Sequence, residues 1–178
     1  RYIGPIDGHS IPDLLYHLRH LESQQAGPVL LHVTTEKGRG YEHARQNPAR
    51  YHGVPGFCQA TGAIASSGKP SFSSVFGEAA VELAARHPGI HAITAAMKDG
   101  TGLTPFAEAH WDRFHDVGIA EEHAVTYAAG LAIGGLRPIC AIYATFMQRA
   151  LDCVYHDVVL PQLPVIFTLD RAGAVEDG

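Results

Sequence analysis

The chain has 178 residues, a length that suits one ordinary domain or parts of two and is too short for a large multidomain enzyme. Hydrophobic residues make up 46% and charged residues 17%, which is the balance of a folded α/β protein and excludes disordered, collagen-like and coiled-coil chains. The net charge is −5 and no long Lys/Arg cluster occurs, so the electrostatic footprint of a nucleic-acid-binding protein is missing.

No apolar run approaches the roughly 18 residues that a membrane-spanning helix needs, and no signal peptide opens the chain, so we expect a soluble protein without a membrane partner. The chain starts at Arg1 in a turn-rich string and stops at Gly178 in a loop, so we also expect an excerpt of something longer. The cysteines lack CxxC spacing and are interpreted as small hydrophobic residues: Cys58, Cys140 and Cys153.

Histidine is unusually frequent in this chain. Protonation of all 12 histidines would move the formal charge from −5 to +7, so we expect sensitivity to acid. The nearest pairs are His17/His20 and His87/His91, and helix-breaking Pro88 separates the second pair. We therefore expect scattered surface and loop histidines, and no metal site within this chain.

The first 70 residues predict one helix, one strand and a long connection. Ser10 and Asp13 begin an amphipathic helix that ends before Gly27, and the segment 29–35 predicts a buried strand. From Glu36 to about Lys69 the pattern dissolves into Gly, Pro, Asn and Ser. We interpret that stretch as a functional loop followed by an interdomain linker.

Strands and helices alternate regularly after residue 70. The predicted helices span 72–86, a short segment capped by Thr104, 120–133 and 146–160. The predicted strands are IHAITAA, FHDVG, PICAIYA and PVIFTLD. This alternation predicts an α/β fold with a parallel sheet covered by helices on both faces.

Ligands of an open parallel sheet bind outside the carboxyl ends of its strands, and three predicted strands end beside polar residues. Glu121 follows one of them and begins a helix whose neighbouring positions carry small apolar residues: Ala124, Val125, Ala128, Ala129 and Ala132. We therefore expect the carboxylate of Glu121 to face the interior rather than water. Desolvation there favours the neutral carboxyl and the helix N-terminus favours the anion, a balance that suits proton transfer. An acid that only stabilises the helix dipole is an equally good interpretation, and it is the preferred one for Glu122.

The other two strand ends carry Arg149 and Arg171, which could hold a phosphate or carboxylate or form ordinary surface ion pairs. Tyr143 and Phe146 lie nearby and would most often be core or rim aromatics. The string KGRGY, residues 37–41, contains a glycine pair that lets backbone amides approach an anion, although such turns are common.

Six strings in collinear order carry a resemblance to a known family: GPIDGH, EKGRGYEHA, YHGVPGF, DVGIAEEHAV, AIYATFMQRA and LPVIFTLDRAG. They closely resemble the 1-deoxy-D-xylulose-5-phosphate synthases, thiamine-diphosphate enzymes of the transketolase group. The resemblance implies a condensation of pyruvate, after decarboxylation, with D-glyceraldehyde 3-phosphate. The product, 1-deoxy-D-xylulose 5-phosphate, feeds isoprenoid precursors, thiamine and pyridoxal phosphate.

The resemblance also implies roles for individual residues. Glu121 would hydrogen-bond the aminopyrimidine nitrogen of thiamine diphosphate, and Phe146 would stack on that ring. Tyr41 and Lys37 would contact the cofactor, and His52 would serve proton transfer or oxyanion stabilisation. The residues implied for the phosphate and hydroxyls of the acceptor aldehyde are Tyr143, Arg149, Arg171 and Asp177, the last in a loop one residue shorter than the family pattern.

By the same resemblance, residues 1–48 end a diphosphate-binding domain, 49–70 form a linker and 71–178 begin a pyrimidine-binding domain. The Mg2+ ligands are then expected upstream, the enzyme is a homodimer, and its location is the cytoplasm, or a plastid in a plant or alga. The isolated segment is expected to be inactive. Another thiamine-diphosphate enzyme such as a transketolase, and a non-catalytic α/β module, remain the alternative interpretations.

Overall fold

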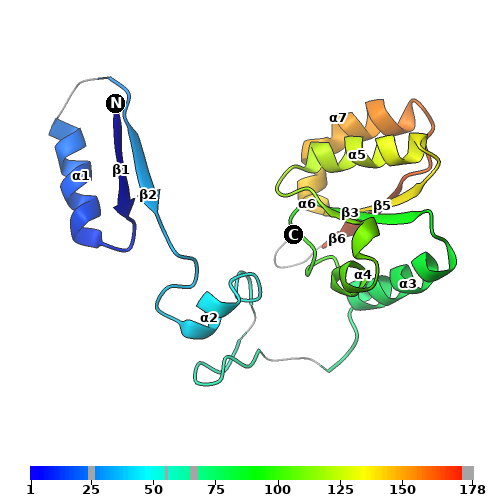
Figure 1. The fold of residues 1–178 in the computed structure, drawn as a ribbon, viewed down its shortest axis with the longest axis horizontal. Helices are drawn as coiled ribbons and strands as arrows, with labels where there is room; N and C mark the ends of the chain where they lie inside the picture. Colours follow the sequence, from blue (N-terminus) through cyan, green and yellow to red (C-terminus); the bar gives the residue numbers. More distant parts are fainter. Residues whose placement is uncertain (24–26, 55, 65–67, 174–178) are drawn as a thin grey trace. The chain divides into compact units, whose positions relative to one another are not determined.

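The computed structural model describes residues 1–23, 27–54, 56–64 and 68–173, which fall into two compact units, 1–67 and 68–178 (Figure 1). The division between the units lies inside the segment 49–70 that was interpreted as a linker. Most of that segment therefore groups with the first unit, and its role as a linker stays a prediction. In the described part of the chain, no helix is long and apolar enough to cross a membrane.

Unit 1 is built on a parallel strand pair with one helix beside it. Strand β1 (Tyr2–Asp7) leads to helix α1 (Ile11–Ser23), and β2 (Leu30–Thr34) returns parallel to β1. The sequence predicted the helix and β2 but took the residues of β1 for turns. The burial expected for β2 is wrong, because a parallel strand is buried only where other elements cover both faces, and four of its five residues are exposed.

The segment after β2 has more structure than its composition indicated. Helix α2 (Glu42–Gln46) lies within it, and an isolated antiparallel bridge joins Phe57 to Ile64. The rings of Tyr41, Tyr51 and Phe57 contact one another with centroids 5.6–5.8 Å apart. These aromatic contacts give the stretch a small cluster of its own, which no helical or strand periodicity could reveal.

Unit 2 contains a parallel sheet in the order β4-β3-β5-β6, as the alternation of elements predicted. Its strands are β3 (Ile90–Thr94), β4 (Phe114–Asp116), β5 (Arg137–Tyr143) and β6 (Ile166–Asp170). Its helices are α3 (Phe72–Arg86), α4 (Thr104–Ala109), α5 (Glu121–Ile133), α6 (Ala144–Met147) and α7 (Leu151–Cys153). A 3₁₀ turn (Trp111–Arg113) precedes β4, another (Gln148–Ala150) joins α6 to α7, and a π-helical segment (Val154–Val159) follows α7.

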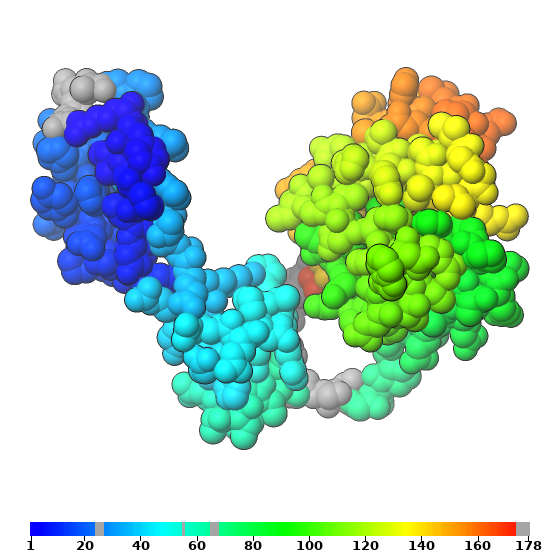
Figure 2. All heavy atoms as spheres, in the orientation of Figure 1, coloured from blue at the N-terminus to red at the C-terminus, as the bar shows by residue number. Residues whose placement is uncertain are grey.

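Helices cover both faces of this sheet (Figure 1). Alternate residues of β5 point to opposite sides: Cys140 and Ile142 pack with α5 and the π-helical segment, whereas Ile139 and Ala141 pack with α3 and α4. In the space-filling view the yellow residues of α5 lie against the orange residues of α7 and its continuation (Figure 2). The central strands are therefore buried on both sides, which explains their nearly continuous apolar sequence.

Several local expectations for unit 2 need correction. Thr104 does not cap α4: it is the first helical residue, and its hydroxyl donates to Asp99 at 2.5 Å. The predicted helix 146–160 begins at Ala144 and changes between α, 3₁₀ and π hydrogen bonding along its length. Cys140 is a buried apolar residue as expected, and burial raises the pKa of its thiol to about 12. Cys58, in unit 1, is exposed instead.

Candidate functional site

The centre of the candidate site in unit 2 is the carboxylate of Glu121 at the start of α5. Its side chain is 2% exposed, and both of its oxygens accept from Nη1 of Arg149, at 3.1 and 3.3 Å. The five small residues predicted to surround it are all buried: Ala124, Val125, Ala128, Ala129 and Ala132. The interior placement of Glu121 is therefore confirmed, and the carboxylate has one charged partner that is itself about half exposed.

The loop between β4 and α5, which leads directly to Glu121, is held by Asp116 at the end of β4. Oδ1 of Asp116 accepts from the backbone N–H of Ala96 at 2.8 Å and of Gly118 at 3.0 Å. Ala96 lies just beyond β3 and has a φ of 59°, a left-handed conformation that is uncommon for a residue with a side chain. Asp116 thus ties the ends of two neighbouring strands together directly before α5 begins.

The other residues predicted at this edge of the sheet form a continuous series of contacts. The ring of Phe146 is stacked on that of Tyr143 at 5.8 Å, and the guanidinium of Arg149 lies 5.5 Å from the Phe146 centroid. On the other side, the guanidinium of Arg171 lies 4.2 Å from the Tyr143 centroid, a cation–π distance. The structure thus brings together five of the residues that the sequence singled out, starting from Glu121.

Gly100 is a site residue that the sequence analysis missed. A Cβ atom at this position would overlap the hydroxyl of Tyr143, so only a glycine leaves that ring its place. Gly100 lies in the segment between β3 and α4, and nothing in the composition of that segment indicates which distant side chain it must accommodate. Backbone approach by a glycine becomes visible only when the partner residue is placed.

The site residues predicted in the first unit lie on the loops after β2. Nζ of Lys37 is 2.9 Å from Nδ1 of His52, so the structure joins two of the three. The third, Tyr41, donates its hydroxyl to the carbonyl of Gln59 at 2.9 Å within the aromatic cluster. Burial, and secondarily the neighbouring Tyr51, raises the pKa of the Tyr41 phenol above its ordinary value.

Asp177, expected to contact substrate, lies outside the described residues. In the described part of the chain, no group of three or more His, Cys, Asp or Glu residues is arranged to hold a metal ion. At one edge of its sheet, unit 2 offers the buried carboxylate of Glu121 and the aromatic ring of Phe146, which is 39% exposed. It also offers two guanidinium groups, those of Arg149 and Arg171. Such a set can bind a planar heterocycle through the carboxylate and an anion through arginine.

Family models match both parts of the chain. One described as "Transketolase, pyrimidine binding domain" matches residues 68–178, and one described as "1-deoxy-D-xylulose-5-phosphate synthase" matches residues 1–35. The first model covers unit 2 and more than half of the chain, and the second covers the first 35 residues of unit 1.

Similar sequences cover the chain almost end to end. It is 56% identical to the 1-deoxy-D-xylulose-5-phosphate synthase of Desulforudis audaxviator, 55% to that of Aquifex aeolicus and 53% to that of Desulfotalea psychrophila. Each match includes 99% of this chain but only 27–28% of the relative. Among solved structures, a split gene transketolase described as an inactive beta4 tetramer is 33% identical, over 53% of this chain and 32% of that chain, with a TM-score of 0.49.

Proposed function

Because this chain belongs to the transketolase pyrimidine-binding family, and within it to the 1-deoxy-D-xylulose-5-phosphate synthases, we propose that it is the central part of such an enzyme. The complete enzyme condenses pyruvate, with loss of CO2, and D-glyceraldehyde 3-phosphate to 1-deoxy-D-xylulose 5-phosphate. The observation that carries the proposal is the carboxylate of Glu121, which is buried at the head of α5 among small residues. Arg149 contacts both this carboxylate and the accessible ring of Phe146.

The residues present fit thiamine diphosphate, which supplies the carbanion chemistry when bound. Glu121 holds a proton in a hydrogen bond to the aminopyrimidine nitrogen, since a carboxyl group sheltered from water keeps that bond directional. Phe146, partly exposed beside Arg149, offers its face for stacking on the same ring. Lys37 and Tyr41 contact the cofactor, with Lys37 near the diphosphate.

The remaining residues serve the two substrates. His52 stabilises charge or transfers a proton near the bound pyruvate. Its imidazole is in contact with the ammonium group of Lys37. Tyr143 and Arg171, already in contact through a cation–π arrangement, hold the phosphate and hydroxyls of the aldehyde together with Asp177 and Arg149. Arg149 combines this task with its hydrogen bonds to Glu121, because a single guanidinium presents several donors.

We extend the proposal to the setting of the enzyme. Mg2+ accompanies the diphosphate and is held by ligands outside this chain. The enzyme is a cytoplasmic homodimer that supplies the precursors of isoprenoids, thiamine and pyridoxal phosphate. The three-part division into residues 1–48, 49–70 and 71–178 belongs to the same proposal.

The test is a substitution of Glu121→Gln in the full-length enzyme, with loss of CO2 from pyruvate and formation of 1-deoxy-D-xylulose 5-phosphate as separate readouts. We expect both rates to fall at least about 100-fold, the lower range for a group that takes part in proton transfer. Glu122→Gln is the matched control, because Glu122 is the exposed neighbour on the same helical turn, and it should retain both rates.

Two outcomes would contradict the proposal. Near-normal rates in Glu121→Gln would remove the role of the carboxylate. Formation of pentulose phosphate from ketose donors by the unmodified enzyme, without use of pyruvate, would assign it to the transketolase activity instead.

A further inference from the structure

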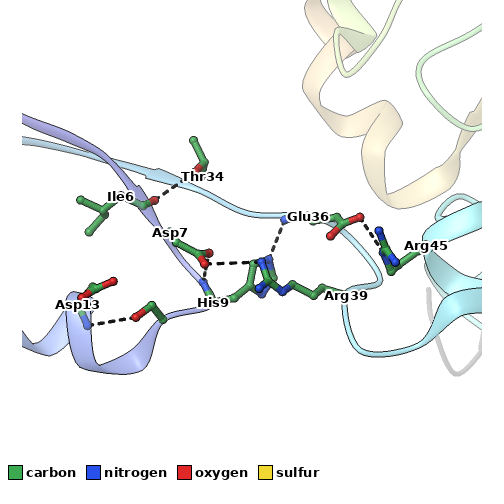
Figure 3. A network of polar contacts seen from close by, with 9 residues as sticks. Ile6, Asp7, His9, Asp13, Thr34, Glu36, Arg39 and Arg45 are labelled. Atoms are coloured by element: carbon green, nitrogen blue, oxygen red, sulfur yellow. Dashed lines mark hydrogen bonds and ion pairs between the residues drawn. The ribbon is translucent and has the colours of Figure 1, made fainter.

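A polar network joins the loop after β1 to the loop after β2 (Figure 3). The backbone N–H of Glu36 donates to Nε2 of His9 at 2.7 Å, and the guanidinium of Arg39 lies 3.6 Å from Oδ2 of Asp7. Asp7 in turn accepts from the backbone N–H of His9 at 2.9 Å. The two loops are thus joined at two points, one on each side of Lys37.

The contact made by His9 continues the pairing of the two strands. Their ladder ends with the N–H of Gly8 donating to the carbonyl of Thr34 at 2.8 Å. Beyond that point the imidazole nitrogen of His9 takes the place of a backbone acceptor and receives the N–H of Glu36. Since a backbone N–H can only donate, Nε2 must be unprotonated, and a neutral His9 carries its proton on Nδ1.

The loop after β2 is also held from its far side. The carboxylate of Glu36 accepts from Nε of Arg45 in α2 at 2.7 Å. Gly38, with a φ of 82°, lies so close to the backbone of Ala44 that a Cβ atom would come within 2.6 Å of it. The residues around Lys37 are therefore held by contacts with both β1 and α2, and Nζ of Lys37 lies 2.9 Å from Nδ1 of His52.

We infer that His9 is a positioning residue: it holds the loop 36–39 so that Lys37 is presented to the diphosphate of the cofactor and to His52. The expected effect on cofactor binding rests on the proposed function, whereas the hydrogen bond between Glu36 and His9 does not depend on it. The ion pair between Asp7 and Arg39 contributes less, because both side chains are about half exposed and water screens them. The backbone-to-imidazole bond is the directional element of the network.

The first experiment measures binding of thiamine diphosphate, in the presence of Mg2+, to the full-length enzyme by calorimetry. His9→Ala removes the acceptor, and we expect binding about three- to tenfold weaker, the factor that one ordinary hydrogen bond supplies. His9→Gln places an amide oxygen near the position of Nε2 and should restore binding to within about twofold of the unmodified enzyme.

His17→Ala is the matched control, because it removes a partly exposed histidine of α1 whose ring contacts that of Tyr16. Its cofactor affinity should equal that of the unmodified enzyme. Unchanged affinity in His9→Ala would overturn the inference, and so would a His9→Gln variant as weak as His9→Ala.

A second measurement separates this inference from the proposed function. In the 178-residue chain without cofactor, nitrogen NMR should show His9 with an unprotonated Nε2, and amide exchange at Glu36 should be slowed in the unmodified chain and in His9→Gln but not in His9→Ala. Fast exchange at Glu36 in all three would overturn the positioning role. If the exchange pattern holds and thiamine diphosphate does not bind the full-length enzyme, the proposed function fails while the structural contact stands.

Discussion

Arg149 neutralises Glu121 across 28 residues of sequence, with one guanidinium nitrogen 3.1 and 3.3 Å from the two carboxylate oxygens. The carboxylate is 2% exposed, so its charge cannot be solvated by water. The pair consequently links the first turn of α5 to the 3₁₀ turn between α6 and α7, two segments that each follow a strand of the sheet.

A double-mutant cycle on this pair has a defined expected outcome. Arg149→Ala should lower the free energy of unfolding of unit 2 by about 1–3 kcal/mol, because it leaves a buried carboxylate without its charged donor. The same substitution should cost clearly less in a Glu121→Gln background, where no buried charge remains. Urea unfolding of the chain followed by circular dichroism measures both. Equal costs in the two backgrounds would show that the pair contributes no coupling.

Unit 2 should lose stability in mild acid. Nδ1 of His91 lies 3.0 Å from Nε2 of His115, and Nδ1 of His115 lies 3.3 Å from the hydroxyl of Tyr127. Burial lowers the pKa of both imidazoles, with Arg113 adding to the effect on His91 and His91 adding to that on His115. Asp112 opposes it at His91.

Since the folded pKa values lie below the unfolded value of about 6.5, the unfolded chain binds more protons in this range. The stability from these neutral histidines is complete above pH about 6.5 and is lost as the pH falls through the folded pKa values. The urea midpoint of unit 2 should therefore fall between pH about 7.5 and 5, and fall less in a variant with His91→Gln and His115→Gln. His87→Gln, an exposed control, should retain the full decrease. The raised pKa of His156 beside Asp157 acts in the opposite direction and is common to all variants.

Substitution of the two glycines in the string KGRGY distinguishes the cost of backbone strain from the cost of steric overlap. Gly38 and Gly40 both have a positive φ, 82° and 94°, but only at Gly38 would a Cβ atom meet the backbone of Ala44. Gly38→Ala should therefore lower the stability of unit 1 by at least about 1 kcal/mol more than Gly40→Ala. Amide exchange in α2 reports the difference. Equal effects would mean that the positive φ alone determines the loss of stability and that the overlap with Ala44 adds nothing.

Arg113 connects the end of α3 to the turn before β4. Its Nη1 donates to the carbonyls of Ala84 at 3.0 Å and Pro88 at 3.3 Å. Because these carbonyls have no helical partner, Arg113→Met should cost about 1–3 kcal/mol in unfolding free energy. Arg86→Met, at a surface position of α3, should stay within about 0.5 kcal/mol. A cost for Arg113→Met as small as that of Arg86→Met would show that water replaces these bonds.

The sequence predicted the sheet of unit 2 and the edge at which its polar residues meet. The bounds 72–86 predicted for helix α3 are confirmed. Local signals set both ends of this helix, since Ser71 forms a capping box at its start and Pro88 follows its end. The apolar stripe expected on that helix, Val75, Phe76, Ala79, Ala80 and Leu83, was only partly right. Ala80 is buried, whereas Val75 is 53% and Leu83 39% exposed, and the other buried residues of the helix are Gly77 and Ala84. Periodicity identifies an apolar face, but the depth of each residue depends on what packs against it.

Strand β1 shows the opposite limit. Its six residues include Gly4 and Pro5, which by composition indicate a turn, and only the pairing with β2 makes them a strand. The tertiary structure overrides local propensity here because each hydrogen bond between β1 and β2 satisfies backbone N–H and C=O groups that would otherwise lack a partner in the fold.

For the candidate site, the sequence alone determined which residue types follow which strands and, through the small residues after Glu121, that its carboxylate faces the interior. Only the tertiary structure decided that Arg149 neutralises this carboxylate, that Gly100 makes room for Tyr143 and that His9 receives the N–H of Glu36. The physical reason is the same in each case. The face on which a side chain lies follows from periodicity within one element, whereas a contact at hydrogen-bond distance depends on how two elements far apart in sequence are brought together.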